Sequence, residues 1–315
     1  MTKKEAFLST AVTVAIMLVA AGTAASAETR IEKSLKLEPG GRLVLEVDGG
    51  GVDVKGGPGA GAKILVTSKQ DDLQDKYDFS FTEEPGLVRV TAKKKGGWTS
   101  SWFGGWTSDP APQFEIQVPT KTGLDLRTGG GHIEVSTIEG EAILKTSGGH
   151  IGLKNIVGDA RVETSGGHIE AESVTGTLEA KTSGGHLKLA GVKGDLKART
   201  SGGHIDIKDA GGRVDAETSG GHIEASFAEG NARGGRLDTS GGSIHVKVDS
   251  RVALSFDAST SGGTVKSSLP LTKTDSKADS ETRSSLRGTL GAGGERLVLR
   301  TSAGSITIDG LYPSL

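Results

Sequence analysis

The sequence contains no cysteine. This absence excludes disulfide bonds, a thiol nucleophile, a thiolate metal site and lipid attachment through cysteine. An excess of one charge is also absent, because 37 lysines and arginines stand against 39 aspartates and glutamates. The longest basic run is Lys93-Lys94-Lys95, so nothing in the sequence points to a nucleic-acid-binding protein.

Glycine, by contrast, is abundant, with 50 residues in a chain of 315. Many of these glycines follow a strict period of 18 residues between positions 128 and 235, where the clearest copy reads Thr200-Ser201-Gly202-Gly203-His204-Ile205. A fixed period of this length is typical of a solenoid. Six histidines, each preceded by glycine, share the period: His132, His150, His168, His186, His204 and His222.

Each 18-residue unit divides into two halves of nine residues, and both halves begin at a glycine. Apolar and polar residues alternate after the glycine, as in Gly203-His204-Ile205-Asp206-Ile207, which predicts a short strand with one buried face. Glycine allows a sharp turn between the strands, because it can adopt positive φ. The sequence therefore predicts an all-β protein, a single-stranded parallel β-helix or solenoid, with two short strands in each 18-residue coil.

The apolar positions of the repeat form four rows, which predict the core of the coil stack. The first row is Ile133, Ile151, Ile169, Leu187, Ile205 and Ile223. The second row is Val135, Leu153, Ala171, Leu189, Ile207 and Ala225. The third row, expected on the opposite side, is Ala142, Ala160, Leu178, Leu196, Val214 and Ala232. The fourth row, expected to fill a corner, is Ile138, Ile156, Val174, Val192, Ala210 and Ala228. Since no coil can bury its apolar face alone, neighbouring coils must do so together.

Residues 1–27 have the pattern of a secretory signal peptide. Lys3 and Lys4 provide a basic start, an apolar run follows from Phe7 to Ala21, and Ala25-Ser26-Ala27 is typical of a cleavage site. A retained membrane anchor is the alternative, although the apolar run is short for a membrane span. We therefore expect an exported protein, located in the periplasm, secreted, or at the cell surface.

The limits of the repeat define the expected organisation of the rest of the chain. Residues 28–57 contain a first coil, and residues 121–315 form the solenoid, with a loop at 270–290. Residues 58–120 lose the period but keep strand-like runs, so we expect a β insert that caps one end of the stack. Solenoids need such caps, because an open end presents unpaired strand edges. The run Leu297–Ile308 predicts a last coil.

All three tryptophans of the chain lie within one glycine- and serine-rich segment of this insert. The segment contains Trp98, Trp102, Phe103 and Trp106. One interpretation is a loop that packs its own aromatic side chains against the cap. The other is an exposed tip that contacts a membrane, a glycan or a protein partner, because tryptophan combines a large apolar area with a polar edge.

The six periodic histidines are the strongest candidates for a chemical site. If the neighbouring isoleucines point inward, the histidines point outward and stack at about 4.8 Å, the spacing between strands. Such a ladder is a candidate site for Zn²⁺, Cu²⁺ or Ni²⁺, and the alternative is a stacked surface row without a ligand. Protonating adjacent rings costs on the order of 1 kcal/mol per exposed pair, so we expect histidine pKa values to be lowered in the folded state.

Other periodic rows suggest further functions. Outward carboxylates at Glu134, Glu170, Asp206 and Glu224 allow a polysaccharide-cleaving β-helix to be considered, but they follow the repeat, whereas a catalytic pair normally interrupts it. The turns lack the aspartate of calcium-binding nonapeptide solenoids. A threonine row suggests ice or crystal-surface binding, but its orientation beside the glycine turn is ambiguous. Its members are Thr146, Thr164, Thr182, Thr200 and Thr218.

Several segments together resemble the bacterial adhesin-domain β-solenoid family. These are the recurring Thr-Ser-Gly-Gly-His-Ile, the segment Gly49-Gly50-Gly51-Val52, the Trp-Phe-Gly loop and the closing segment Thr301–Ile306, so the resemblance covers roughly residues 40–310. The resemblance implies an exported or envelope-associated protein with a surface-contact role and without an assigned biochemical activity.

We therefore expect a non-catalytic exported protein of the cell envelope that acts as a structural or interaction module and has no cofactor. Its partner would be an envelope protein, a glycan or a membrane surface. The alternatives are a transition-metal-binding envelope protein that uses the histidine ladder and a polysaccharide-acting β-helix enzyme.

Overall fold

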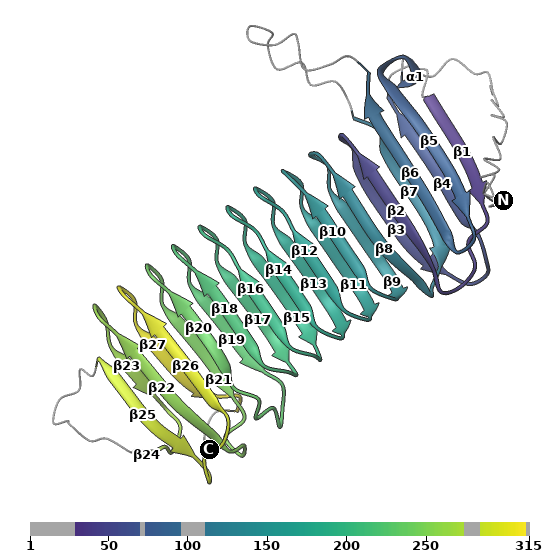
Figure 1. Cartoon of the computed structure of the whole chain (residues 1–315). Coiled ribbons are helices and arrows are strands. Elements are labelled where there is room, and N and C mark those ends of the chain that lie inside the picture. The colour runs from purple at the N-terminus through teal and green to yellow at the C-terminus, as the bar shows by residue number, and fades with distance from the viewer. Residues whose placement is uncertain (1–28, 70–72, 96–110, 274–283, 313–315) are drawn as a thin grey trace, which may run out of the picture.

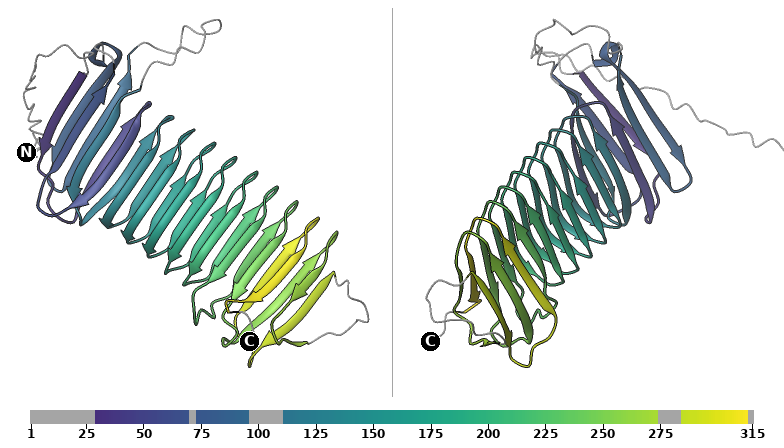
Figure 2. Two further views of the ribbon diagram at one scale, coloured as in Figure 1. Left: turned by 180° about the vertical axis from the view of Figure 1, so that it is seen from behind. Right: turned by 60° about the vertical axis from the view of Figure 1, so that its left-hand side comes forward.

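The computed structural model describes residues 29–69, 73–95, 111–273 and 284–312. These residues form two long sheets that face each other along one elongated stack (Figure 1). Turns at the long edges join the two sheets, and the helix α1 (Leu73–Lys76) is a single turn beside one end of the stack (Figure 2). The predicted all-β solenoid is confirmed.

Both sheets are built from strands that follow one another coil by coil. In its spatial order, the first sheet contains β1 (Thr29–Leu35), β4 (Ala62–Ser68), β7 (Gln113–Pro119), β3 (Gly51–Gly57), β9 (Ile133–Glu139), β11 (Ile151–Val157), β13 (Ile169–Thr175), β15 (Leu187–Val192), β17 (Ile205–Ala210), β19 (Ile223–Phe227), β21 (Ile244–Val248), β27 (Ile306–Gly310) and β23 (Val265–Ser267). The second sheet, again in spatial order, contains β24 (Thr272–Lys273), β25 (Ser285–Leu290), β22 (Leu254–Thr260), β26 (Arg296–Thr301), β20 (Gly235–Thr239), β18 (Val214–Thr218), β16 (Leu196–Arg199), β14 (Leu178–Lys181), β12 (Ala160–Glu163), β10 (Ala142–Thr146), β8 (Thr122–Thr128), β2 (Gly41–Val47), β6 (Leu87–Lys94) and β5 (Tyr77–Glu84).

The 18-residue period is also the pairing register of the coils. Ile151 in β11 is paired with Ile133 on one side and with Ile169 on the other, and all three are parallel neighbours. Their side chains are buried, as are the other members of the first two predicted rows. Each coil therefore contributes two strands whose inward residues meet in one narrow core, as the alternation predicts.

A left-handed backbone residue shapes one corner of each central coil. At this corner the strand shows two exposed residues in succession before the next buried one, as at Lys154, Asn155 and Ile156 in β11. The left-handed residue interrupts the alternation, so the fourth predicted row can turn inward and fill the corner. This position is occupied at 18-residue intervals by Thr137, Asn155, Ser173, Gly191 and Asp209, which have φ between 55° and 65°.

Two predicted core residues are wrong, because the period breaks after β19. Gly235 is paired with Val214, so Ala232 is not in the third row and is only partly buried. Phe227 takes the corner position opposite Ala210 and is buried, whereas Ala228 is not. Three extra residues follow in this turn, since Gly235 lies 21 residues after Val214.

Buried Asn231 stabilises this longer turn. Its Nδ2 donates to the carbonyl oxygens of Ala210 and Gly212, the latter at 3.0 Å, and its Oδ1 accepts the backbone N–H of Arg233 at 2.8 Å. Because an unpaired buried polar group is costly, these bonds explain why an asparagine is accommodated inside the turn.

Both ends of the stack contain a coil whose position differs from its order in the sequence. Strands β2 and β3 lie between the coil β6–β7 and the coil β8–β9. At the other end, β26 and β27 lie between the coil β20–β21 and the coil β22–β23. The coil at residues 41–57 is thus second in the stack, and the last coil of the sequence is not the last in space (Figure 1).

Antiparallel strands close the ends beyond these coils. Strand β1 pairs with β4, which pairs antiparallel with β7, and β5 pairs with β6. The region 58–120 therefore supplies cap strands as well as the parallel coil β6–β7. At the C-terminal end β25 pairs antiparallel with β22, so a strand begins inside the segment 270–290, which the sequence pattern predicts to be a loop.

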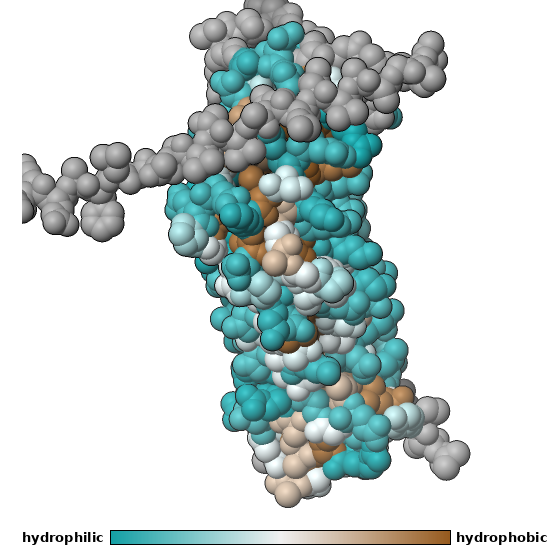
Figure 3. All heavy atoms as spheres, turned by 90° about the vertical axis from the view of Figure 1, so that its right-hand side faces the viewer, coloured by the Kyte–Doolittle hydropathy of each residue, from teal (hydrophilic) through white to brown (hydrophobic). Residues whose placement is uncertain are grey.

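The outer surface of the stack is largely polar. In the view of Figure 3, hydrophilic residues predominate along both flanks of the coils, and smaller groups of apolar residues are visible between them. Among the described residues, the exposed large hydrophobic side chains are those of Val157 and Tyr312. Within the same residues, no helix is long and apolar enough to cross a membrane.

Candidate functional site: the polar ladders of the turns

The six periodic histidines form a stacked ladder on the outside of six successive turns. These turns precede the first-sheet strands β9, β11, β13, β15, β17 and β19. Successive ring centroids are 4.9–5.2 Å apart, and successive ring planes differ by only 1–9°. All six side chains are exposed, as expected from the inward orientation of the isoleucines that follow them.

Hydrogen bonds between coils hold the rings in this arrangement. The backbone N–H of each histidine after His132 donates to Nδ1 of the histidine one coil earlier, at 2.8–3.3 Å. The last ring, His222, accepts the N–H of Ser243 in the same way. A nitrogen that accepts a hydrogen bond carries no proton, so this network assigns each neutral ring a proton on Nε2.

The ladder continues after the histidines with hydroxyl groups in the same role. Ser243 Oγ accepts the backbone N–H of Ser305, and Ser305 Oγ accepts that of Thr264, at 3.2 and 3.3 Å. These residues belong to successive coils in space, although they are far apart in sequence. The shared requirement is therefore an acceptor for the backbone N–H of the next coil, and the histidines satisfy it with Nδ1.

This hydrogen-bond pattern does not favour metal binding. A metal-bound histidine usually binds through one nitrogen and donates a hydrogen bond from the other. Here Nδ1 must accept, so a metal on Nε2 would require either loss of the bond between coils or a deprotonated ring. Among the described residues, no group of three or more acidic or histidine side chains is arranged to hold a metal ion.

The environment of the ladder lowers the pKa of at least two of the rings. Partial burial and then the neighbouring rings hold the pKa of His168 below its ordinary value, with His150 and His186 on either side. The pKa of His204 is lowered by the same causes, with His186 and His222 as its neighbours. The direction agrees with the prediction for these two residues, but burial is a larger cause than the neighbouring rings on which the prediction is based.

The threonine row has a structural role on the inner side of the same turn. Its members are buried, and each Oγ1 donates to a glycine carbonyl of the preceding coil at 2.8–2.9 Å. The same oxygen accepts the backbone N–H of the glycine three residues later at 3.2–3.3 Å. The interpretation of these threonines as an ice-binding surface is wrong, because their side chains do not reach solvent.

The glycine before each histidine is required by close approach between coils and not by positive φ. A Cβ on Gly185 would lie 1.9 Å from the carbonyl oxygen of Gly167, whereas a Cβ on Gly184 would meet no atom closer than 3.8 Å. Neither residue has positive φ. The two glycines of the motif therefore differ in function, which the sequence alone does not reveal.

The periodic carboxylates of the first sheet are mostly paired with cations. Glu170 accepts from Lys188, Asp206 lies 3.6 Å from Lys208, and Glu224 accepts from Lys247. Glu134 has a different environment, because its carboxylate occupies the space above Gly152. Desolvation, and then the nearby carboxylates of Asp53 and Glu170, raise its pKa. These contacts account for three of the four carboxylates as surface ion pairs.

The tryptophan segment and a seventh histidine are separate from the ladders in sequence. Trp98, Trp102, Phe103 and Trp106 lie outside the described residues.

His245, which sequence reasoning did not select, binds Asp309 at 3.0 Å through Nε2, and Asp309 also accepts from Ser268. His245 lies outside the 18-residue period, which is the signal that distinguishes it from the ladder.

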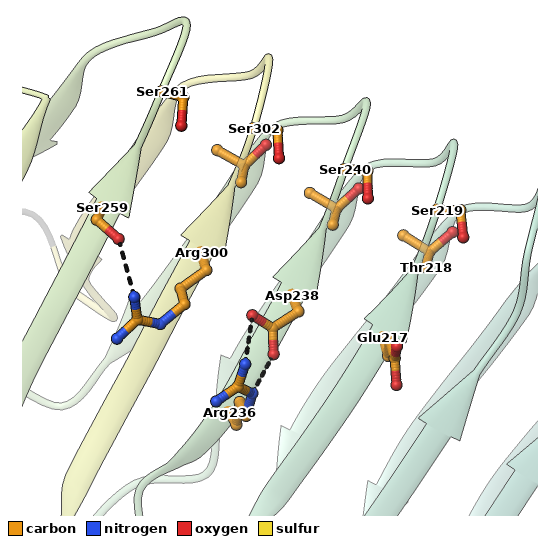
Figure 4. A pocket seen from close by; sticks show the side chains of 12 residues that line it. Glu217, Thr218, Ser219, Arg236, Asp238, Ser240, Ser259, Ser261, Arg300 and Ser302 are labelled. Carbon is orange, nitrogen blue, oxygen red and sulfur yellow. Dashed lines mark hydrogen bonds and ion pairs between the residues drawn. The ribbon is translucent and has the colours of Figure 1, made fainter.

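Sequence reasoning also missed a hollow on the outer face of the second sheet. It has a volume of about 460 Å³ and crosses the strands β18, β20, β26 and β22 near their turn (Figure 4). Serines from the four turns line one side, and Arg236, Asp238 and Arg300 line the other (Figure 4). No sequence period reveals it, because β26 reaches this position only through the altered coil order.

Comparison with known proteins supports the fold. The structure is similar to a "putative adhesin" of Parabacteroides distasonis, with a TM-score of 0.50, 11% identity, and 90% of this chain and 97% of that chain covered. A "putative adhesin" of Bacteroides fragilis covers 90% and 98% of the two chains at 12% identity and a TM-score of 0.43. A "putative lipid binding protein" of Parabacteroides distasonis covers 90% and 97% at 13% identity and a TM-score of 0.42. No curated protein matches the sequence.

The family assignment rests on a longer match in the sequence itself. Residues 42–309 match the Toastrack DUF4097 family, and this range extends from β2 to β27. It therefore includes both relocated coils as well as the periodic centre. The chain belongs to the Toastrack DUF4097 family.

Proposed function

We propose that this protein is an exported, non-catalytic component of the cell envelope that acts as a rigid structural and contact module. The observation that carries the proposal is the use of the repeated polar side chains. Histidine and threonine of each turn join one coil to the next through hydrogen bonds. These side chains of the repeat therefore stabilise a long, regular surface, and such a surface is suited to contact with a partner.

Export is supported by the pattern of residues 1–27. The similar solved proteins named as adhesins are consistent with a role at a surface. Three of the four periodic carboxylates of the first sheet form ion pairs with lysines, which supports the proposal that they do not catalyse a reaction.

The proposal is tested by expressing the full chain with a C-terminal tag in a bacterium that has the general secretion pathway. We expect mass spectrometry to find a mature N-terminus at Glu28 and fractionation to find the protein outside the cytoplasm. Purified protein should then be retained by isolated cell envelopes. An intact N-terminus with cytoplasmic location, or no retention by envelopes, would contradict the proposal.

The tryptophan segment can be tested in the same retention assay. A variant with Trp98, Trp102 and Trp106 changed to Ser is compared with the unchanged protein. Reduced retention would assign the contact to this segment, and unchanged retention would assign it to the coil surface.

A further inference from the structure

The hollow on the second sheet differs from the remainder of this face. Upstream coils carry long charged side chains at the position before the buried threonine. In the hollow the corresponding residues are Glu217, Asp238, Arg300 and Ser259, so two of the four side chains, Asp238 and Ser259, are shorter. The upstream residues are Lys145, Glu163, Lys181 and Arg199.

Unpaired hydroxyl groups line the turn side of the hollow. Ser219, Ser240, Ser302 and Ser261 come from four neighbouring coils, and their side chains follow one another along the edge (Figure 4). All four are exposed, and none of their hydroxyl groups has a hydrogen-bond partner among the described residues. Since strand spacing sets their separation, they span roughly 14 Å along the stack.

The opposite side of the hollow presents groups that both donate and accept hydrogen bonds. Arg236 is held by Asp238 through both of its carboxylate oxygens. Arg300 is held less firmly, with 3.5 Å to Ser259 Oγ and 3.7 Å to Asp257. Its remaining N–H groups are therefore available to a ligand.

The charges of the lining select against ionic ligands. Arg236 and Arg300 are balanced by Glu217 and Asp238, so the lining has no net charge. An anionic ligand would meet the two carboxylates, and a cationic ligand would meet the two guanidinium groups. The lining also contains no aromatic or large aliphatic side chain, which disfavours the core of a protein–protein interface.

We infer that this hollow binds a neutral, extended oligosaccharide, with its sugar hydroxyls paired to the serine row, Arg300 and Asp238. A ligand rich in hydroxyl groups both donates and accepts, as this lining requires. Sugars of an extended β-1,4-linked chain follow one another at a distance close to the spacing of the coils. The inference rests on the proposed contact function and names the ligand class for one part of the surface.

The test measures binding of soluble oligosaccharides to the purified chain by isothermal titration and by saturation-transfer NMR. The neutral probes are cellohexaose and chitohexaose, and the charged probes are hexagalacturonate and a fully deacetylated chitosan hexamer. We expect saturable binding of at least one neutral probe and at least tenfold weaker binding of both charged probes. Absence of binding by both neutral probes, or preference for a charged probe, would overturn the inference.

Two matched triple variants locate the binding site. The first changes Ser240→Ala, Ser302→Ala and Arg300→Gln in the hollow, and the second changes Ser165→Ala, Ser183→Ala and Lys181→Gln at equivalent positions of central coils. We expect the first to weaken binding at least tenfold and the second to leave it within twofold. Equal loss in both variants, or no loss in the first, would contradict the assigned site.

Thermal unfolding of both variants verifies that they are folded before binding is compared. The binding experiment uses free sugars and purified protein, so it is independent of export. Failure to bind with normal export would reject only the sugar site, and binding without export or envelope retention would reject only the proposed location.

Discussion

At the scale of single residues, neighbouring positions of the turn motif have different structural roles. Threonine bonds two coils from the inside, the second glycine permits their backbones to approach, and histidine accepts a backbone N–H from the outside. The residue between Thr182 and the two glycines, Ser183, stays exposed. Each position is thus constrained by a different contact, although all follow one period.

The two adjacent glycines provide a direct test of close packing. Gly185→Ala would place a Cβ 1.9 Å from the backbone of the preceding coil, so we expect a loss of about 4 kcal/mol in the free energy of unfolding, or no folding. Gly184→Ala is the control, with open space and an effect within about 1 kcal/mol. Urea unfolding measures both, and equal effects would show that close approach is not the constraint.

The buried threonine hydroxyl is tested by Thr182→Val, which keeps the shape of the side chain. The change removes a partner from the carbonyl of Gly167 and from the N–H of Gly185. Leaving buried polar groups unpaired costs about 1–3 kcal/mol each, so we expect an unfolding free energy lower by about 2 kcal/mol or more. Thr182→Ser retains the hydroxyl and should lose less than half as much; the reverse order would contradict this role.

At the scale of the elements, the histidine ladder couples strand stacking to protonation. Protonation of Nδ1 would convert an acceptor into a donor facing the N–H of the next coil, as between His186 and His204. Among the described residues, no acidic side chain forms an ion pair with His168 or His204 that would compensate for the lost hydrogen bond. The pKa values of these two residues are lowered by burial and by the neighbouring rings. The folded ladder therefore disfavours the charged form.

The stability of the protein should depend on pH in one direction. Because folding lowers the pKa of His168 and His204, the unfolded chain binds more protons as pH falls below the unfolded histidine pKa of about 6.5. Stability is thus retained above this pH and decreases below it, which unfolding midpoints at pH 7.5 and pH 5 would show. The variant with His168, His186 and His204 changed to Ser keeps a hydrogen-bond acceptor for the backbone N–H of the next coil. The difference between its unfolding midpoints at the two pH values should therefore be smaller. Equal midpoints at both pH values in the unchanged protein would contradict the coupling.

Metal binding by the ladder is an untested alternative that titration can decide. The hydrogen-bonded Nδ1 atoms lead us to expect no micromolar binding of Zn²⁺, Ni²⁺ or Cu²⁺. Isothermal titration of the unchanged protein and of the triple serine variant compares the two directly. Micromolar binding that is lost in the variant would show that the rings exchange their bonds between coils for a metal.

The central coils could be predicted from sequence because one period controls both pairing and burial. A residue such as Ile169 repeats its neighbours Ile151 and Leu187, so register and inward orientation follow from the pattern. Ala232 could not be placed, since the longer turn around Asn231 shifts the register without a mark in the local alternation. The hollow on the second sheet was missed for a related reason, because Ser302 and Ser240 become neighbours only through long-range pairing.

At the scale of the whole molecule, the relocated coils tie each end of the stack to its interior. The coil β26–β27 pairs with β20–β21 on one side and with β22–β23 on the other. Strand β22 has β26 and β25 as its partners in the second sheet, and both come later in the sequence. The segment after β21 therefore cannot complete its pairing until the end of the chain has been added.

Truncation after residue 291 tests this order, because it removes β26 and β27 and leaves β22, β23 and β25 in place. We expect the β22 amides that face β26 to lose their partner and their protection in hydrogen exchange, while the β22 amides that face β25 and the amides of β18 stay protected. Removal of residues 313–315 alone is the control and should leave β22 protected. If the β22 amides that face β26 in the full chain kept their protection after the longer truncation, another strand would have replaced β26, and the relocated coil would not be required to close this end.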